Sequence, residues 1–308
     1  MRTRDYVRLA ADGLYGGTGG AAVSAEEAAD EGLEIYEGVL YSYTGNKEHV
    51  NIPVGVELIA EHAFAGNNTV KNIVVPEGVV QVAPNAFSDC GALERVAFSK
   101  GLTEIPQSLF EGLSTLKEVI LPEGIKSIGK SAFHGCSSLT RVVLPDSVET
   151  IGKEAFAGCS SLVSVHFPLE LKRIGSDAFE GCSSIMEAVI PEGVKEIGEN
   201  AFANSGLKMA HLPKSLQVIA ANLFYNCGKL RHVRIDEGVT QIKENAFGKC
   251  SVLTRIIIPL SISTITGSIF DFCPMLTIYC RVRTAPIGWS PKWCLGKEES
   301  VNWGYTGI

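Results

Sequence analysis

Residues 139–161 read LTRVVLPDSVETIGKEAFAGCSS, and this stretch contains the pattern that determines the fold. Apolar residues recur through its opening segment LTRVVL, as in a short strand with one buried face. Pro145 ends that strand because proline has no backbone N–H to donate to a neighbouring strand. The segment VETI forms a second, shorter extended piece, after which Gly152 allows a tight turn towards Phe156.

The same pattern recurs along most of the chain, where ten phenylalanines are spaced by 23 residues, with one interval of 22. They are Phe64, Phe87, Phe110, Phe133, Phe156, Phe179, Phe202, Phe224, Phe247 and Phe270. One unit cannot bury its own apolar side chains, but stacked copies can, because each column packs against the same column of its neighbours. The sequence therefore predicts a single solenoid of about ten 23-residue coils, with stacked parallel strands joined by short turns or helical turns.

The repeats divide the chain into four expected regions. We expect a flexible or poorly structured leader over residues 1–32, an N-terminal cap over 33–52, the repeat solenoid over 53–275 and a C-terminal cap over 276–308. The leader includes GLYGGTGGAA (13–22), but no G-K-[ST] follows these glycines, so a phosphate-binding loop is not expected. It also lacks the continuous apolar segment of a cleavable export signal.

Composition excludes several classes of function. The chain is 45% hydrophobic and 20% charged, as in a folded protein, and its net charge of −7 argues against a general nucleic-acid binder. No apolar run approaches the roughly 18 residues of a membrane-spanning helix, so membrane insertion is not expected. The motifs H-E-x-x-H, C-x-x-C and G-x-S-x-G are absent from the sequence. We therefore expect no catalytic residue, no cofactor, no metal site and no enzyme activity.

The cysteines follow the repeat. Seven of the nine stand three residues after a repeat phenylalanine: Cys90, Cys136, Cys159, Cys182, Cys227, Cys250 and Cys273. Other units have Asn67, Leu113 or Ser205 there, so the position takes a small or medium buried side chain. Equivalent positions on successive coils lie about 4.8 Å apart with parallel side chains, which suits no disulfide. Cys280 and Cys294 lie outside this column, and the sequence leaves a disulfide between them open.

Two candidate catalytic groups have a simpler structural explanation. The segment SAFHGCSSL (131–139) places His134 two residues before a cysteine, but other coils have alanine, serine, glutamate or glycine in place of this histidine. That mixture marks a solvent-facing position, while the cysteine faces the core. In the C-terminal cap, Trp289, Trp293 and Trp303 surround a cysteine, and such aromatic residues are typical of the lid over an end coil.

The repeated motif resembles a known family. IGKEAFAGCSSL (151–162), together with LPEGI (121–125) and IPEGV (190–194), resembles the BspA-like leucine-rich repeats. EIYEGVLYSYTGNKEHVNIP (34–53) and TIYCRVRTAPIGWSPKWCLG (277–296) resemble the caps of that family. Its members are mostly bacterial or protist surface proteins that act as adhesion or protein-binding scaffolds without catalysis. The resemblance implies the same function here, at a cell surface or after secretion.

The outward positions of the predicted strands form two rows across the stack. The first row is His49, Asn72, Arg95, Glu118, Arg141, Ser164, Glu187, Met209, His232 and Arg255. The second row is Asn51, Val74, Ala97, Ile120, Val143, His166, Val189, His211, Arg234 and Ile257. The second row is unusually apolar for residues that face water, and exposed apolar area edged by charges often marks a binding surface.

These rows supply the candidate contacts with a protein or glycan partner. The candidate residues are Val74, Ile120, Val143, His166, His211, His232 and Arg234. His166 and His211 are two coils apart, about 10 Å, which is too far to share a metal ion. Two alternatives remain. Valine and isoleucine favour strands whether or not they bind anything, and the protein could be a structural spacer or surface-coat element with no specific ligand.

Overall fold

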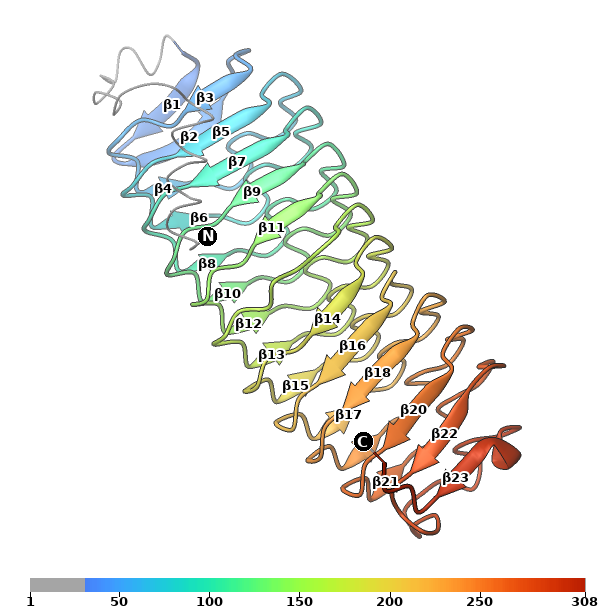
Figure 1. Ribbon diagram of the computed structural model, residues 1–308. Helices are drawn as coiled ribbons and strands as arrows, with labels where there is room; N and C mark the ends of the chain where they lie inside the picture. The colour runs from blue at the N-terminus through green and yellow to red at the C-terminus, as the bar shows by residue number, and fades with distance from the viewer. Residues whose placement is uncertain (1–30, 308) are drawn as a thin grey trace.

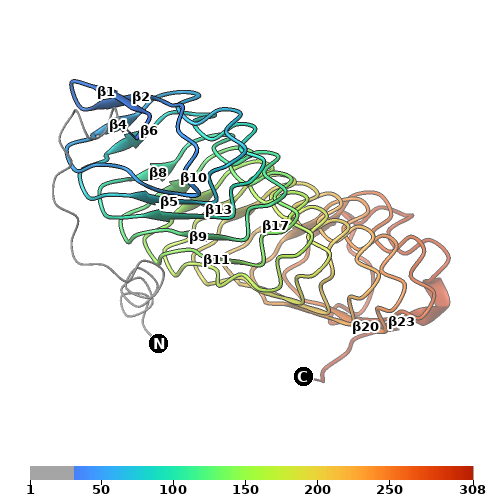
Figure 2. The same ribbon diagram turned by 90° about the horizontal axis from the view of Figure 1, so that it is seen from above.

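The computed structural model describes residues 31–307, so the predicted leader lies almost entirely outside the described residues. The described chain winds into a parallel β-solenoid of about 12 turns, with its strands stacked along one long axis (Figure 1). Seen from above, the coils enclose a continuous tube with strands along its sides (Figure 2). This architecture confirms the predicted solenoid, with slightly more turns than the repeats alone indicate.

The longer strands form what we call the face sheet. Its strands are β3 (His49–Asn51), β5 (Asn72–Val75), β7 (Arg95–Phe98), β9 (Glu118–Ile120), β11 (Arg141–Val143), β14 (Glu187–Val189), β16 (Met209–Leu212), β18 (His232–Ile235), β20 (Arg255–Ile258), β22 (Thr277–Cys280) and β23 (Val301–Trp303). Equivalent repeat positions pair, so that Arg141 lies opposite Glu118 and Glu118 opposite Arg95. The register therefore follows the repeat, with an offset of 23 residues in most strand pairs and of 22 between β14 and β16 and between β20 and β22.

Shorter strands form a second row of pairings around the tube. They are β4 (Leu58–Ile59), β6 (Gln81–Val82), β8 (Glu104–Ile105), β10 (Ser127–Ile128), β12 (Thr150–Ile151), β13 (Arg173–Ile174), β15 (Glu196–Ile197), β17 (Val218–Ile219), β19 (Gln241–Ile242) and β21 (Thr264–Ile265). These strands divide into three sheets, with breaks between β6 and β8 and between β15 and β17. The second break falls in the one unit that is 22 residues long.

A proline explains the first break. At this repeat position the backbone N–H normally donates to the preceding coil, as Ala83 does to Ile59 at 2.8 Å and Gly129 to Ile105 at 2.7 Å. Pro106 occupies the same position in the coil between them and has no N–H to donate to Val82. The pairing of β6 with β8 therefore fails while the stack continues.

Each end of the described solenoid differs from the repeat. At the N-terminal end, β1 (Leu33–Tyr36) and β2 (Val39–Tyr43) form an antiparallel hairpin, and β2 pairs with β4. At the C-terminal end, the 3₁₀-helix η1 (Glu298–Ser300) precedes β23. It is the only helix among residues 31–307.

The repeat phenylalanines stack along the centre of the tube. All ten are fully buried or nearly so, and neighbouring rings lie 4.9 Å apart at Phe133–Phe156 and 5.9 Å apart at Phe202–Phe224. The column continues into Tyr43 at one end, and at the other Trp293 packs edge-on against Phe270. The tryptophans of the C-terminal region thus cover the end of the core, as expected of a lid.

The cysteine column is a ladder of buried thiols. All nine cysteines are free and buried, including Cys280 and Cys294, so no disulfide joins these two. The seven column thiols donate to the phenylalanine carbonyl of the preceding coil, as Cys136 does to Phe110 at 3.0 Å. Burial raises the pKa of the Cys136 thiol to about 12. The column position therefore favours a small side chain that can donate a weak hydrogen bond to this carbonyl. The sequence predicted the small size but not the hydrogen bond.

Candidate binding face

We use the term outer face for the side chains of the face sheet that point away from the core. Of the predicted contacts, Val74, Val143 and His211 are partly exposed, whereas His166, His232 and Arg234 are exposed. Ile120 differs from the expectation, because it packs between Ala97 and Val143 in the ladder and keeps only 6% of its surface exposed. Ile120 therefore contributes to packing more than to an accessible surface.

The outer face is interrupted between β11 and β14. Residues 164–167 form no strand, and a single bridge joins Ser164 to Arg141. His166 lies in this interruption rather than in the strand that the repeat predicts. The interruption divides the outer face into an N-terminal half (β3 to β11) and a C-terminal half (β14 to β23).

Charges alternate on the N-terminal half. Lys71 Nζ lies 2.7 Å from Glu48 Oε1, and in the next two coils Lys117 Nζ lies 2.9 Å from Glu94 Oε2. Such exposed ion pairs stabilise a fold only slightly. Their main consequence is that the cations of this half lie beside carboxylates of the same chain.

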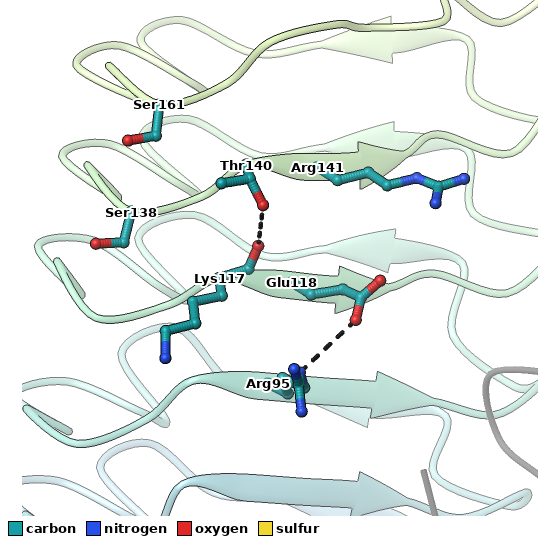
Figure 3. Close-up of a pocket in the computed structure, with 7 residues that line it drawn as sticks. All are labelled: Arg95, Lys117, Glu118, Ser138, Thr140, Arg141 and Ser161. Atoms are coloured by element: carbon teal, nitrogen blue, oxygen red, sulfur yellow. Dashed lines mark hydrogen bonds and ion pairs between the residues drawn. The ribbon is translucent and has the colours of Figure 1, made fainter. Parts of the chain in front are cut away.

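A shallow pocket lies beside this half. It has a volume of about 480 Å³ and is lined by Arg95, Lys117, Glu118, Ser138, Thr140, Arg141 and Ser161 (Figure 3). Two of its contacts are internal: Arg95 faces Glu118 at 3.8 Å, and Thr140 donates to the Lys117 carbonyl at 3.4 Å. The charged side chains of this pocket therefore already have intramolecular partners.

The C-terminal half carries an excess of positive charge. Within its strands and the residue before each strand, the cations are Lys208, Arg231, Arg234 and Arg255, and the anion is Glu187. The same definition gives the N-terminal half the cations Lys71, Arg95, Lys117 and Arg141 against the anions Glu48, Glu94 and Glu118. Because the whole chain has a net charge of −7, this local excess is a distinct feature of the surface.

Asp236 departs from the repeat directly after β18. Eight repeat units have proline at this position, including Pro213 and Pro259 in the two neighbouring coils. One Asp236 carboxylate oxygen accepts a hydrogen bond from His211 Nε2 at 2.8 Å, and the other accepts one from Arg234 Nε at 2.8 Å. Burial opposes ionisation of Asp236, but the contacts with His211 and Arg234 outweigh it and lower its pKa.

The face sheet opens beside this carboxylate. Strands β16 and β18 pair at four positions, as do β20 and β22, but β18 and β20 pair only at His232 and Arg255. Ile235 is therefore only partly buried, whereas Leu212 and Ile258, its counterparts in the adjacent strands, have no exposed surface. The separation of the two strands leaves backbone groups outside the ladder.

We call the resulting pocket the β18–β20 opening. It has a volume of about 480 Å³ and is lined by Val233, Arg234, Ile235, Asp236, Glu237, Ile257, Pro259 and Arg281. Glu237 is held by backbone N–H groups of the next coil, at 3.1 Å from Leu260 and 3.0 Å from Ser261. Arg281 in turn lies 3.3 Å from Glu237. Two arginines are thus anchored by fixed carboxylates at the rim of one pocket.

Sequence reasoning identified only part of this site. It selected His211 and Arg234 as outward residues but missed Asp236, Glu237 and Arg281. The available signal was the segment IDEGV, in which aspartate replaces the proline of IPEGV. A departure from a strict repeat is visible without a structure, but the separation of β18 and β20 beside it is not.

Apolar side chains are also exposed on the C-terminal half. Val189 is 54% exposed, and Met186 and Met209 lie on the same two coils with 43% and 39% exposed. Exposed apolar groups among charges are common in binding surfaces. Among residues 31–307, no helix is long and apolar enough to cross a membrane, and no group of three or more histidine, cysteine or carboxylate side chains could hold a metal ion.

The comparison with protein families agrees with the repeat architecture. A family model described as BspA type leucine rich repeat region matches residues 34–163 and 149–277, with six copies. A leucine-rich repeat protein of T. pallidum is 26% identical, with a TM-score of 0.49 over 70% of this chain and 82% of that chain. One from Bacteroides ovatus is 24% identical, with a TM-score of 0.48 over 84% and 87%. No curated protein is detectably similar.

Proposed function

Since the chain belongs to the BspA-type leucine-rich repeat family, we propose that it is a non-enzymatic scaffold that binds a protein or glycan partner through its outer face. The C-terminal half would be the main contact region, and adhesion is the use that the family resemblance implies. The observation that carries this proposal is the local excess of positive charge, with Arg234 held by Asp236.

Rigid presentation is the physical basis of this function. Strands in fixed register hold their outward side chains at constant spacing, and the continuous core holds the strands. A preorganised surface loses little conformational entropy on binding, so more of the contact energy appears as affinity. The N-terminal half shares the same core, but its cations already contact carboxylates of the same chain.

The test compares the two halves as binding surfaces. Three proteins would be used to capture partners from the native source. They are the intact chain, a His211→Ala/Arg234→Gln variant and a Lys117→Gln/Thr140→Ala control. We expect captured partners to be lost with the first variant and kept with the control. If both variants capture the same partners as the intact chain, the outer face is not the contact surface, and a spacer explains the protein better.

A further inference from the structure

We propose that the β18–β20 opening binds a carboxylate side chain of an extended acidic peptide segment, with Arg234 and Arg281 as the residues that contact it. This inference rests on the proposed function and gives that function a partner chemistry. It depends on three features: the orientation of the arginines, the backbone of the separated strands and the charge of the surrounding surface.

The arginines are anchored in a way that leaves donors available. Asp236 binds Arg234 through Nε, so both terminal nitrogens of this guanidinium remain to contact a ligand. Glu237 contacts Arg281 through one terminal nitrogen. Guanidinium groups bind carboxylates through paired N–H donors, and an arginine already held in place loses less entropy when it does so.

The two anchoring carboxylates are themselves occupied. Asp236 accepts hydrogen bonds on both oxygens, from His211 and Arg234. Glu237 accepts from two backbone N–H groups and faces Arg281. Both anions therefore act as supports for the arginines, and the groups left to contact a ligand are donors.

The walls of the opening favour a peptide. The ladder between β18 and β20 ends after His232 and Arg255, so backbone groups of the following residues are not paired across the gap. Peptide ligands use such main-chain groups for hydrogen bonds, as when an extended segment binds along a strand. Ile235, Ile257 and Pro259 add aliphatic surface, and no aromatic ring lines the opening.

The surrounding charge favours an acidic ligand. Lys208, Arg231 and Arg255 lie on the same half of the outer face, and none of them forms an ion pair within the described residues. Complementary charge steers association and favours the matching partner over others. An acidic peptide would therefore meet an attractive potential before it reaches the opening.

The probe is a dye-labelled peptide with the sequence Val-Glu-Val-Glu-Val and blocked termini, titrated against the full chain by fluorescence anisotropy at low salt. Its matched partner replaces both glutamates with glutamine. We expect the glutamate peptide to bind at least about tenfold more tightly, because glutamine cannot form the charge-assisted hydrogen bonds that a carboxylate forms with arginine. A tenfold change in affinity corresponds to about 1.4 kcal/mol of binding free energy. Equal affinity for the two peptides would overturn the proposal.

Three variants locate the contact. Arg234→Gln and Arg281→Gln should each weaken binding of the glutamate peptide about tenfold. Arg231 lies on the same coil as Arg234 but does not line the opening. Arg231→Gln removes one positive charge there, so it should weaken binding less than about threefold. Equal losses in all three would show general electrostatic attraction instead of a site, and would contradict the proposal. Thermal melting of each variant checks that the fold is intact.

A further arm separates the partner classes. An oligogalacturonate of similar charge should bind more weakly than the glutamate peptide; tighter binding of this acidic sugar would overturn the assignment to a peptide. If the glutamate peptide fails to bind while the His211→Ala/Arg234→Gln variant still loses captured partners, the ligand class is wrong and the scaffold function stands. If that variant keeps its captured partners as well, both proposals fail.

Discussion

The N-terminal and C-terminal halves of the outer face share one core and differ in their surfaces. Ring stacking continues through both, at 5.1 Å for Phe110–Phe133 and 5.8 Å for Phe224–Phe247. The N-terminal half carries paired charges and an unbroken ladder from β3 to β11, whereas the C-terminal half has an excess of cations and one opened strand pair. The repeat thus determines the fold, and departures from the repeat mark where the surface differs between the two halves.

The largest effect should come from the core, and it should be the same in both halves. Phe133→Ala and Phe247→Ala each remove a fully buried ring, and each should lower the free energy of unfolding by about 3–5 kcal/mol. Urea denaturation would measure both. His134→Ala, beside Phe133 but exposed, should change it by less than about 0.5 kcal/mol. A much smaller loss at one phenylalanine would show that the two halves do not share one kind of core.

The buried thiols should make the fold sensitive to alkaline pH. Burial raises the pKa of Cys136 and Cys182 to about 12, well above the ordinary thiol value near 9. A thiol whose pKa is raised on folding contributes its full stability below about pH 9 and loses it as the pH rises towards the folded value. The free energy of unfolding should therefore fall above pH 9, by up to about 1.4 kcal/mol per pH unit for each thiol.

Urea denaturation between pH 8 and pH 11 would show this slope. Cys136→Ser keeps a donor to the Phe110 carbonyl but does not titrate in this range, so its slope should be shallower than that of the unaltered chain. Stability that is independent of pH up to 11 would contradict burial of the column. Rapid alkylation of Cys136 in the native protein would contradict it equally.

A smaller effect should appear at acid pH at Asp236, in the C-terminal half. The contacts with His211 and Arg234 lower the pKa of Asp236 despite its partial burial. A carboxyl group with a lowered pKa contributes stability above its unfolded value near 4 and loses it as the pH falls through the folded value. Asp236→Asn should therefore melt at a lower temperature than the unaltered chain at pH 7, and the difference should shrink as the pH falls below the unfolded value near 4. A difference that stays constant as the pH falls would mean that ionisation of Asp236 is not its source.

The core could be predicted from the sequence more fully than the surface. Spacing alone placed Phe133 and its equivalents inside the tube, because only stacked copies can bury a 23-residue unit. The spacing also predicted that Cys136 is a free, buried thiol and that His134 faces solvent, and the structure confirms both. Those positions depend on the repeat length, which the sequence displays directly.

The surface depends on features that the average repeat hides. The average repeat predicts a strand at residues 164–167 and an exposed side chain at Ile120, but the structure has no strand at the first and a buried side chain at the second. Asp236 accepts one hydrogen bond from Arg234, two residues earlier in the same coil, and one from His211, 25 residues earlier in the preceding coil. The second contact lies outside any single repeat unit. The sequence could show that Asp236 replaces a proline, but not which groups it contacts.

Residue-resolved amide hydrogen exchange on the full chain tests the central claim most directly, namely that one uniform repeat core carries a surface altered at a few positions. We expect high and similar protection in both halves for repeat phenylalanine amides that donate to the next coil, such as those of Phe133 and Phe224. Residues 164–167, and Ile235 and Ile257 at the opening, should exchange faster than the equivalent strand residues of other coils. Uniform protection through those positions, or phenylalanine amides that exchange much faster in one half, would contradict the account.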